Sequence, residues 1–304
     1  MHVFVTGGSG QTGPTVVAEL IAAGHTVTGL ARSEDSAAKL RRLGAAVHHG
    51  SLDDLDSLRR GAAAADGVLH MGYGGDFAKP EEMVRRDTNA IDTFGRVLEG
   101  SGKPLIVTSG TLVMPLGRES SETDEPLADG IAGFRVAGER TCLAFADRGV
   151  RACVVRLAPT VHGPNDHGFI PMLIATARKT GVSAYVGGGR NRWPAVHRQD
   201  AAVLFRLALE KAPAGSALHG VAETGIVFKD IAETIGRGLG LPTASLSEEQ
   251  AATHYVSPFM GMLYGIDAPV SSTRTQQRLG WTPSREGLLQ DLVRGDYLTA
   301  RQEK

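Results

Sequence analysis

The chain has little cysteine, few aromatic residues and no long apolar run. Cys142 and Cys153 are its 2 cysteines, which leaves little for a disulfide framework or a metal site, and we expect both in the core. Charge or glycine interrupts each apolar run well before the roughly 20 residues of a membrane span. Because residues 1–6 enter a strand-like run with no basic or apolar leader, we expect a cytoplasmic protein.

The chain also lacks an excess of charge of either sign. Its 32 Lys and Arg residues nearly balance 33 Asp and Glu residues, for a formal net charge of -1. This balance gives no overall attraction to nucleic acid or anionic membranes, so we expect neither as a partner and a small molecule as the substrate. The length of 304 residues allows one nucleotide-binding domain with a smaller lobe.

Short β-branched runs alternate with longer segments of helical period in the first half of the chain. The expected strands are residues 3–6, 25–30, 46–49, 67–71, 105–109 and 151–157. The expected helices between them are residues 15–23, 36–43, 52–64, 80–99 and 137–148. Regular βα alternation predicts an α/β fold with a doubly wound parallel (Rossmann) sheet.

The alternation weakens after Arg156, where loops rich in Gly and Pro are expected at 160–168 and 186–194. A helix at 201–210 and a strand at 217–221 are expected to rejoin the sheet. Further helical segments near 228–239 and 287–295 indicate a second, smaller lobe. We therefore predict a Rossmann domain at 1–158, to which 195–224 return, and a discontinuous substrate-binding lobe at 159–194 and 225–304.

A glycine-rich turn separates the first expected strand from its helix, which opens with Pro14. Glycines let the backbone approach a pyrophosphate, and a helix N-terminus offers free N–H groups and a favourable dipole. The alternative is a tight turn that binds nothing, but the position between strand and helix favours a dinucleotide site. The residues expected to bind the cofactor here are Gly7, Gly10, Gln11, Thr12 and Gly13.

The end of the second expected strand indicates which cofactor is preferred. NAD-selective sites place a carboxylate here to accept hydrogen bonds from the ribose hydroxyls. This chain has Arg32 and Ser33 instead, which can bind a 2'-phosphate, so we predict NADP(H) as the cofactor. We expect Glu34 and Asp35 to lie past the ribose, in the loop. A solvated arginine is the alternative for Arg32.

Together these features resemble the extended short-chain dehydrogenase/reductase (SDR) family, in particular its atypical, epimerase-like branch. Thr-Gly-x-x-Gly-x-x-Gly is that family's cofactor turn, Asn89 matches its structural asparagine, and the resemblance covers nearly the whole chain. Four other segments match its motifs, namely residues 68–71, 156–164, 197–200 and 279–283. Further cofactor contacts implied by the resemblance are Ser51, Leu52, Met71, Gly72, Thr108, Pro159 and Val161.

The family's catalytic Tyr-x-x-x-Lys motif has no counterpart at the matching positions. Counting back from Glu139 places Arg135 at the lysine position and Ile131 at the tyrosine position, and residues 117–140 contain neither tyrosine nor lysine. Gly110 stands where the family has a serine, flanked by Ser109 and Thr111, and either hydroxyl could bind a substrate oxygen.

Tyr73 and His162 are the candidates for a replacement acid. Tyr73 follows the fourth strand at the edge of the sheet where such folds bind ligands, and His162 is of a residue type that often serves as a general acid. The alternative for Tyr73 is a packing or lid residue. The alternative for His162 is a loop residue that is hydrogen bonded to the backbone. Arg135 could bind an anionic group or stabilise an oxyanion, or instead pair with a surface carboxylate.

Several polar and aromatic residues of the second lobe are further candidates for substrate contacts. Asp166 and His167 lack the company of a metal site, and we expect them to form a loop turn. Arg192 and Trp193 could clamp a planar or anionic substrate. A second set could line an apolar pocket or pack in the core: Tyr255, Phe259, Met260, Met262 and Tyr264.

Three functions agree with these residues. The first is an NADP(H)-dependent reductase or dehydrogenase that acts on a carbonyl or imine with a non-standard proton donor. The second is an epimerase, dehydratase or isomerase that retains its cofactor, and the third is a regulatory protein that binds NADP(H) without chemistry. The resemblance also implies a homodimer through the helices at 80–99 and 137–148.

Overall fold

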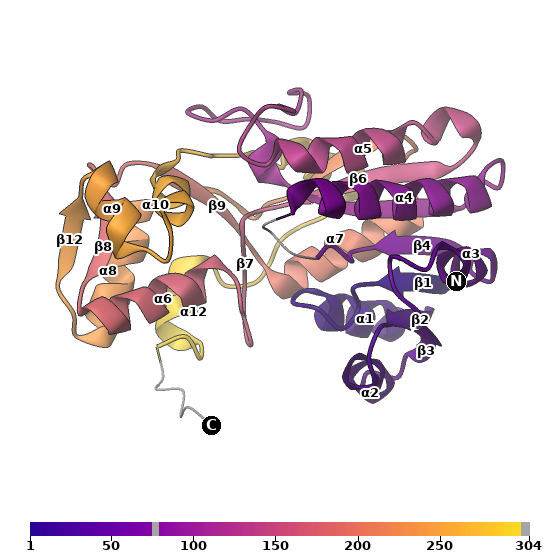
Figure 1. The fold of residues 1–304 in the computed structure, drawn as a ribbon, viewed down its shortest axis with the longest axis horizontal. Coiled ribbons are helices and arrows are strands. Elements are labelled where there is room, and N and C mark those ends of the chain that lie inside the picture. Colours follow the sequence, from indigo (N-terminus) through magenta and orange to yellow (C-terminus); the bar gives the residue numbers. More distant parts are fainter. Residues whose placement is uncertain (75–78, 299–304) are drawn as a thin grey trace.

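The computed structural model describes residues 1–74 and 79–298, and its larger lobe is built on a seven-stranded parallel sheet (Figure 1). The strand order is β10-β6-β5-β4-β1-β2-β3. The bounds are β1 His2–Thr6, β2 Thr26–Ala31, β3 Ala46–His49, β4 Gly67–His70, β5 Pro104–Gly110, β6 Arg151–Leu157 and β10 Ser216–Gly220. The order reverses between β1 and β4, as in a doubly wound sheet, so the predicted fold class is confirmed.

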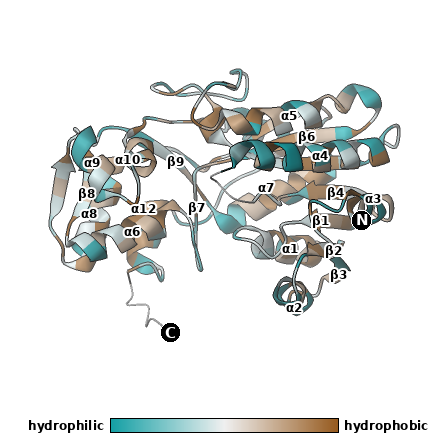
Figure 2. Cartoon of the chain, in the orientation of Figure 1, coloured by the Kyte–Doolittle hydropathy of each residue, from teal (hydrophilic) through white to brown (hydrophobic). Residues whose placement is uncertain are grey.

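Helices cover both faces of this sheet and bury two separate hydrophobic clusters. One face carries α1 (Gly13–Ala22), α2 (Glu34–Arg42) and α7 (Arg198–Lys211); the other carries α3 (Leu55–Ala63), α4 (Pro80–Leu98) and α5 (Val136–Leu143). Figure 2 shows hydrophilic stretches on α2 and α4, whereas β1 and β4 are mostly hydrophobic. Cys153 lies in the first cluster and Cys142 in the second, which confirms both as core residues.

Capping residues set several helix boundaries differently from the sequence prediction. The hydroxyl of Ser33 accepts a hydrogen bond from Ser36 N at 3.3 Å, so α2 begins at Glu34. Glu34 and Asp35 therefore lie in the first turn of a helix and not in a loop. In the same way, Asp54 accepts from Ser57 N at 2.9 Å and delays α3 to Leu55. The helix expected at 137–148 stops at Leu143 and is followed by a 3-10 turn, Ala146–Arg148.

The smaller lobe contains two short sheets with helices around them. Strands β7 (Thr160–His162), β9 (Arg192–His197) and β11 (Glu223–Val227) form one sheet, and β8 (Ser183–Val186) pairs with β12 (Thr243–Leu246). Its helices are α6 Phe169–Thr180, α8 Phe228–Leu239, α9 Glu248–His254, α10 Pro258–Gly265 and α12 Leu288–Arg294. Strand β7 and residues 192–194 of β9 thus lie inside segments predicted as loops. Residues 299–304 of the predicted lobe lie outside the described residues.

The second lobe has its own aromatic core, and this overturns one candidate substrate contact. Trp193 is fully buried and packs against Phe228 and Tyr264, while Arg192 binds Asp267 through two hydrogen bonds of 2.9 and 2.8 Å. The pair therefore cannot clamp a substrate. Tyr255, Met260 and Tyr264 pack in this core, as the second alternative proposed, whereas Phe259 and Met262 are exposed.

Candidate functional site

A groove runs along the carboxyl ends of the central strands, beside the neighbouring strands β1 and β4. It consists of two hollows that share the lining residues Gly7, Gly72 and Tyr73. The outer hollow is lined further by Ser9, Leu30, Arg32, Ser36, Gly50, Ser51, Leu52, Asp53, Gly74 and Arg86. The inner hollow is lined further by Gly10, Gln11, Thr12, Gly13, Met71, Thr108, Leu157 and Phe205. Most of the residues predicted to bind the cofactor therefore lie around one continuous groove.

The three glycines of the turn have different reasons to be glycine. A Cβ on Gly13 would lie 2.1 Å from the Gly7 carbonyl oxygen, and one on Gly7, whose φ is +72°, would lie 2.7 Å from Gly72 N. Packing inside the turn therefore excludes side chains at both positions. A Cβ on Gly10 would meet only the Gly7 oxygen, at 3.2 Å, so its exposed side is free for a ligand to approach.

The N-terminus of α1 at this turn is open to a ligand. Thr12 is its N-cap but makes no side-chain capping bond, so the first turn keeps backbone N–H groups without capping partners. These groups and the helix dipole suit a phosphate, which fits the pyrophosphate of a dinucleotide.

The outer hollow presents a cation at the end of β2. Arg32 is exposed there beside Ser9 and Ser36, whereas the Glu34 carboxylate is hydrogen bonded to Arg41. Among the described residues that line this hollow, Asp53 is the one carboxylate, and Arg86 Nε donates to it at 2.7 Å. Ser33 serves as the N-cap of α2 instead of lining the hollow. Pro159 and Val161 follow Leu157 but line neither hollow.

At the inner end of the groove, Arg135 stacks on Tyr73. The guanidinium carbon lies 3.6 Å from the centre of the tyrosine ring, a cation–π geometry. Arg135 also donates to the carbonyl oxygen of Thr108, and its Nη1 lies 3.6 Å from Asp87 Oδ2. The alternative of a surface pair is therefore wrong, because Asp87 is buried.

A chain of hydrogen bonds leads from this arginine back to the glycine turn. Asp87 Oδ1 lies 3.1 Å from His70 Nε2, and His70 Nδ1 lies 2.6 Å from the Thr6 hydroxyl. Because a carboxylate only accepts, the Nε2 atom of His70 carries the proton and Nδ1 accepts from Thr6. Thr6 in turn accepts from Gly72 N at 3.1 Å. This network fixes Arg135 relative to the backbone of the groove.

Buried polar atoms without a partner gather at the same end of the groove. Among the described residues, no hydrogen-bond partner is found for the hydroxyls of Tyr73, Thr108, Ser109 and Thr111, nor for Arg135 Nη1, which lies 3.6 Å from Asp87 Oδ2. Buried polar atoms are normally hydrogen bonded, so this cluster fits a site that polar groups of a cofactor and substrate complete. Burial raises the pKa of Tyr73 and Arg135 opposes that rise, so its phenol is protonated at neutral pH.

The structure places His162 in the interior of the second lobe. It lies on β7 with 1% of its surface exposed, and its Nδ1 is 2.7 Å from Asp291 Oδ2. In this position it cannot reach a substrate, and its partner is a carboxylate and not the loop backbone. Asp166 is buried in the turn expected for it, and His167 is exposed. No group of three or more metal-ligating side chains occurs in residues 1–74 and 79–298.

Asp87 and His70 are functional candidates that the motif comparison did not single out. Asp87 occupies a position on the buried face of α4, together with Met83, Ala90 and Phe94. A carboxylate at a core position of an amphipathic helix indicates a buried polar partner. The sequence positions 83, 87, 90 and 94 repeat every three or four residues, and this helical period could have identified Asp87 as a buried carboxylate.

The seven-stranded sheet and the groove at its switch point are those of a dinucleotide-binding Rossmann protein. The model of the NAD dependent epimerase/dehydratase family matches residues 3–219, and the chain belongs to this family, which depends on nicotinamide cofactors. Its members include oxidoreductases and epimerases. Within the described residues, no helix has the length and apolarity to cross a bilayer.

Relatives of the chain extend over its whole length. An uncharacterized protein of Schizosaccharomyces pombe is 48% identical over 301 residues, which cover 98% of this chain and 100% of that protein. A 4-hydroxy-2-methyl-3-oxo-4-farnesyl-3,4-dihydroquinoline-1-oxide ketoreductase of Stigmatella aurantiaca is 30% identical over 71% of this chain and 66% of its own. The dTDP-glucose 4,6-dehydratase of Streptomyces venezuelae, solved with NAD, shares the fold with a TM-score of 0.78 at 18% identity, over 97% of this chain and 95% of its own.

Proposed function

We propose that the chain is an NADP(H)-dependent oxidoreductase that acts on a small-molecule carbonyl or imine, with Tyr73 as the proton donor. The observation that carries the proposal is the stacking of Arg135 on Tyr73 at the inner end of the groove. In the resembling SDR enzymes, a lysine lowers the pKa of a catalytic tyrosine. Here Arg135, at the position of that lysine, meets a tyrosine from another position, Tyr73, beside the glycine turn.

The nicotinamide nucleotide, when bound, supplies or accepts the hydride. In the direction of reduction, the Tyr73 hydroxyl gives its proton to the substrate oxygen as the new C–H bond forms. Arg135 stabilises the phenolate that remains, and Asp87 holds the guanidinium in place. Ser109 and Thr111, whose hydroxyls are unpartnered among the described residues, can orient the substrate oxygen. An iminium is already protonated and needs this acid less.

NADP(H) is the cofactor that the outer hollow favours. Arg32 and Ser36 line it, and its carboxylate, Asp53, is engaged by Arg86. A 2'-phosphate would therefore meet a cation and a hydroxyl and no free carboxylate.

The test is NADPH oxidation with a panel of carbonyl and imine substrates, for the wild type and Tyr73→Phe. We expect kcat for a ketone to fall by about 100-fold or more, because a positioned acid contributes on the order of 10² to 10⁴. The NADPH dissociation constant and the melting temperature should change little, because the lost hydroxyl has no partner among the described residues. Tyr185→Phe, in the second lobe, is the matched control.

The same experiment separates the alternatives. Turnover that is unaffected by Tyr73→Phe would refute Tyr73 as the donor. Tight NADPH binding without turnover of any substrate would instead support a regulatory protein. Nucleotide that co-purifies with the chain would support an epimerase or dehydratase that cycles its cofactor.

A further inference from the structure

A separate hollow lies beside the glycine turn, between the turn and the second lobe. Ser9, Gly10, Pro14 and Thr15 line it from the turn and α1, and Pro164, Asn165 and His167 contribute to it from the second lobe. Lys39 of α2 and Arg198 at the start of α7 complete its walls. It shares only part of the turn with the groove that holds Tyr73.

Arg198 is a buried cation in this hollow with unused donors. Its residue is 7% exposed, and its Nε and Nη2 atoms are buried without a hydrogen-bond partner in the described part of the chain. Its stem packs beneath Gly163, where a Cβ would lie 3.0 Å from Arg198 Cγ. A buried guanidinium that lacks an acceptor is unfavourable, so an acceptor from a ligand is expected.

The nearby carboxylate of Asp166 does not serve as that acceptor. Its Oδ1 accepts from Gln11 Nε2 at 2.9 Å and from Gly168 N at 2.6 Å, and its Oδ2 accepts from the Tyr297 hydroxyl at 2.8 Å. These three bonds engage both of its oxygens within the protein. Burial raises the pKa of Asp166, and the charge of Arg198 partly opposes this rise.

Other positive groups converge on the same hollow. Pro14 and Thr15 belong to the first turn of α1, a helix of 10 residues whose N-cap side chain makes no capping bond. The positive end of the helix dipole is therefore open here. The exposed ammonium of Lys39 stands at the rim.

We propose that this hollow binds a phosphate group, held by Arg198 and by the first turn of α1, with Lys39 at its rim. The phosphate belongs to a phosphorylated molecule other than the dinucleotide. The second lobe, through Pro164, Asn165 and His167, takes part in binding it. The proposal does not depend on hydride transfer, so its test is independent of the catalytic role proposed for Tyr73.

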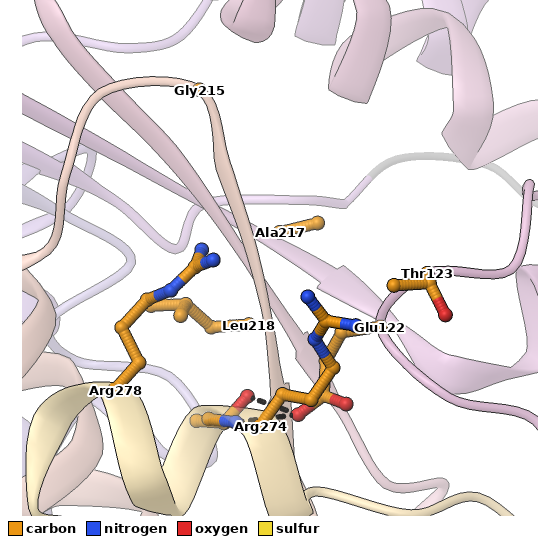
Figure 3. Close-up of a pocket in the computed structure, with 8 residues that line it drawn as sticks. Glu122, Thr123, Gly215, Ala217, Leu218, Arg274 and Arg278 are labelled. Atoms are coloured by element: carbon orange, nitrogen blue, oxygen red, sulfur yellow. Dashed lines mark hydrogen bonds between the residues drawn. The ribbon is translucent and has the colours of Figure 1, made fainter.

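A hollow at the opposite end of the sheet provides a matched control. Arg274 and Arg278 reach over it from α11 (Thr273–Leu279), beside β10 (Figure 3). Both arginines are exposed, and Arg278 donates to the Ser216 hydroxyl at 3.2 Å. Because both are exposed whereas Arg198 is buried, we expect Arg274→Gln to leave the effect of phosphate on the melting temperature unchanged.

The test measures the melting temperature of the full chain in inorganic phosphate, against chloride of equal ionic strength. At phosphate well above its dissociation constant, we expect the wild type and Arg274→Gln to gain about 2–4 °C. Arg198→Gln should lose this gain, and Arg198→Lys should retain part of it. If Arg198→Gln does not fold, Lys39→Gln serves instead and should reduce the gain.

A second measurement, at saturating NADPH, distinguishes a separate phosphate site from the cofactor's own diphosphate site. A phosphate response that persists there identifies a separate ligand. A response that disappears, together with a loss of about tenfold in affinity for both NADPH and NADH in Arg198→Gln, shows that phosphate binds at the cofactor's own diphosphate site and overturns the proposal. The proposal is overturned if phosphate acts equally on the wild type and the Arg198 variants and nucleotide affinity is unchanged.

Discussion

Arg135 covers the ring of Tyr73, with its guanidinium carbon 3.6 Å from the ring centre, although 62 positions of the sequence, including a whole strand and helix, separate the two residues. Arg135 stands at the lysine position of the family's motif, whereas Tyr73 lies far from the tyrosine position, which Ile131 occupies. The backbone of β5 and the carboxylate of Asp87 hold the arginine above the ring. We therefore expect a change at Arg135 to alter the pH dependence of activity. The glycine turn, Arg32 and the buried ion pair between Glu139 and Arg156 are the basis of three further predictions.

Replacing Arg135 by methionine should shift the pH profile of carbonyl reduction. Reduction requires a protonated Tyr73, so activity falls as the pH rises through the pKa of this residue. Burial raises that pKa and Arg135 opposes the rise, so its removal should move the basic limb to higher pH. We also expect kcat to fall by about tenfold or more, because the phenolate loses its cation. Arg135→Lys should bring the limb back towards the wild type, and an unmoved limb in Arg135→Met would contradict the assignment.

The two glycines of the turn should respond differently to alanine. Gly13→Ala places a Cβ 2.1 Å from a backbone oxygen and should lower the melting temperature strongly or prevent folding. Gly10→Ala meets one atom at 3.2 Å, so the protein should fold, but NADPH affinity should fall by about tenfold because the methyl group occupies the approach of the ligand. Calorimetry and fluorescence titration of the same samples check both. Equal loss of stability in the two variants would show that Gly10 serves the fold alone.

Arg32→Ala should weaken NADPH binding and spare NADH. A hydrogen bond to a charged group contributes roughly 1.5–3 kcal/mol, which corresponds to a loss of about tenfold or more in affinity for the phosphorylated nucleotide. Arg41→Ala is the control, because Arg41 lies in α2, the helix that follows Arg32, but is bound to Glu34 outside the hollow. Dissociation constants of both nucleotides from fluorescence titration decide it, and an unchanged NADPH constant would refute the predicted preference.

Glu139→Ala should destabilise the larger lobe. Glu139 and Arg156 are buried and joined by hydrogen bonds of 2.7 and 3.1 Å, so the substitution leaves an uncompensated guanidinium. We expect the free energy of unfolding to drop by roughly 3–5 kcal/mol in a urea titration. Glu99→Ala, which breaks the exposed pair with Arg148, should have little effect. Similar losses in the two variants would show that burial of the first pair is unimportant.

The parts of the molecule that follow local rules could be predicted from the sequence. The strands of the sheet and the glycine turn depend on period, β-branching and turn chemistry within a few neighbouring residues. The second lobe was harder, because β7, β9 and β11 are short strands that pair across more than 20 residues of intervening chain. No local pattern marks such strands.

The candidate site divides in the same way. Residues of the turn lie where the motif places them, but Tyr73 and Arg135 meet only because β4 and β5 are neighbours in the sheet. The burial of His162 against Asp291 and of Trp193 in an aromatic core depends on contacts between distant segments. Such contacts set the exposure of a side chain, and exposure decides whether it can act on a substrate.

Strand β10 is the last strand of the seven-stranded sheet to be synthesised. Strand β10 pairs with β6, but 58 residues that build half of the smaller lobe and all of α7 lie between the two strands in the sequence. During synthesis on the ribosome, the edge of β6 that pairs with β10 therefore has no partner strand until residues 216–220 have emerged. A gene cut after residue 158 would keep that edge open permanently, so we expect the truncated product to aggregate.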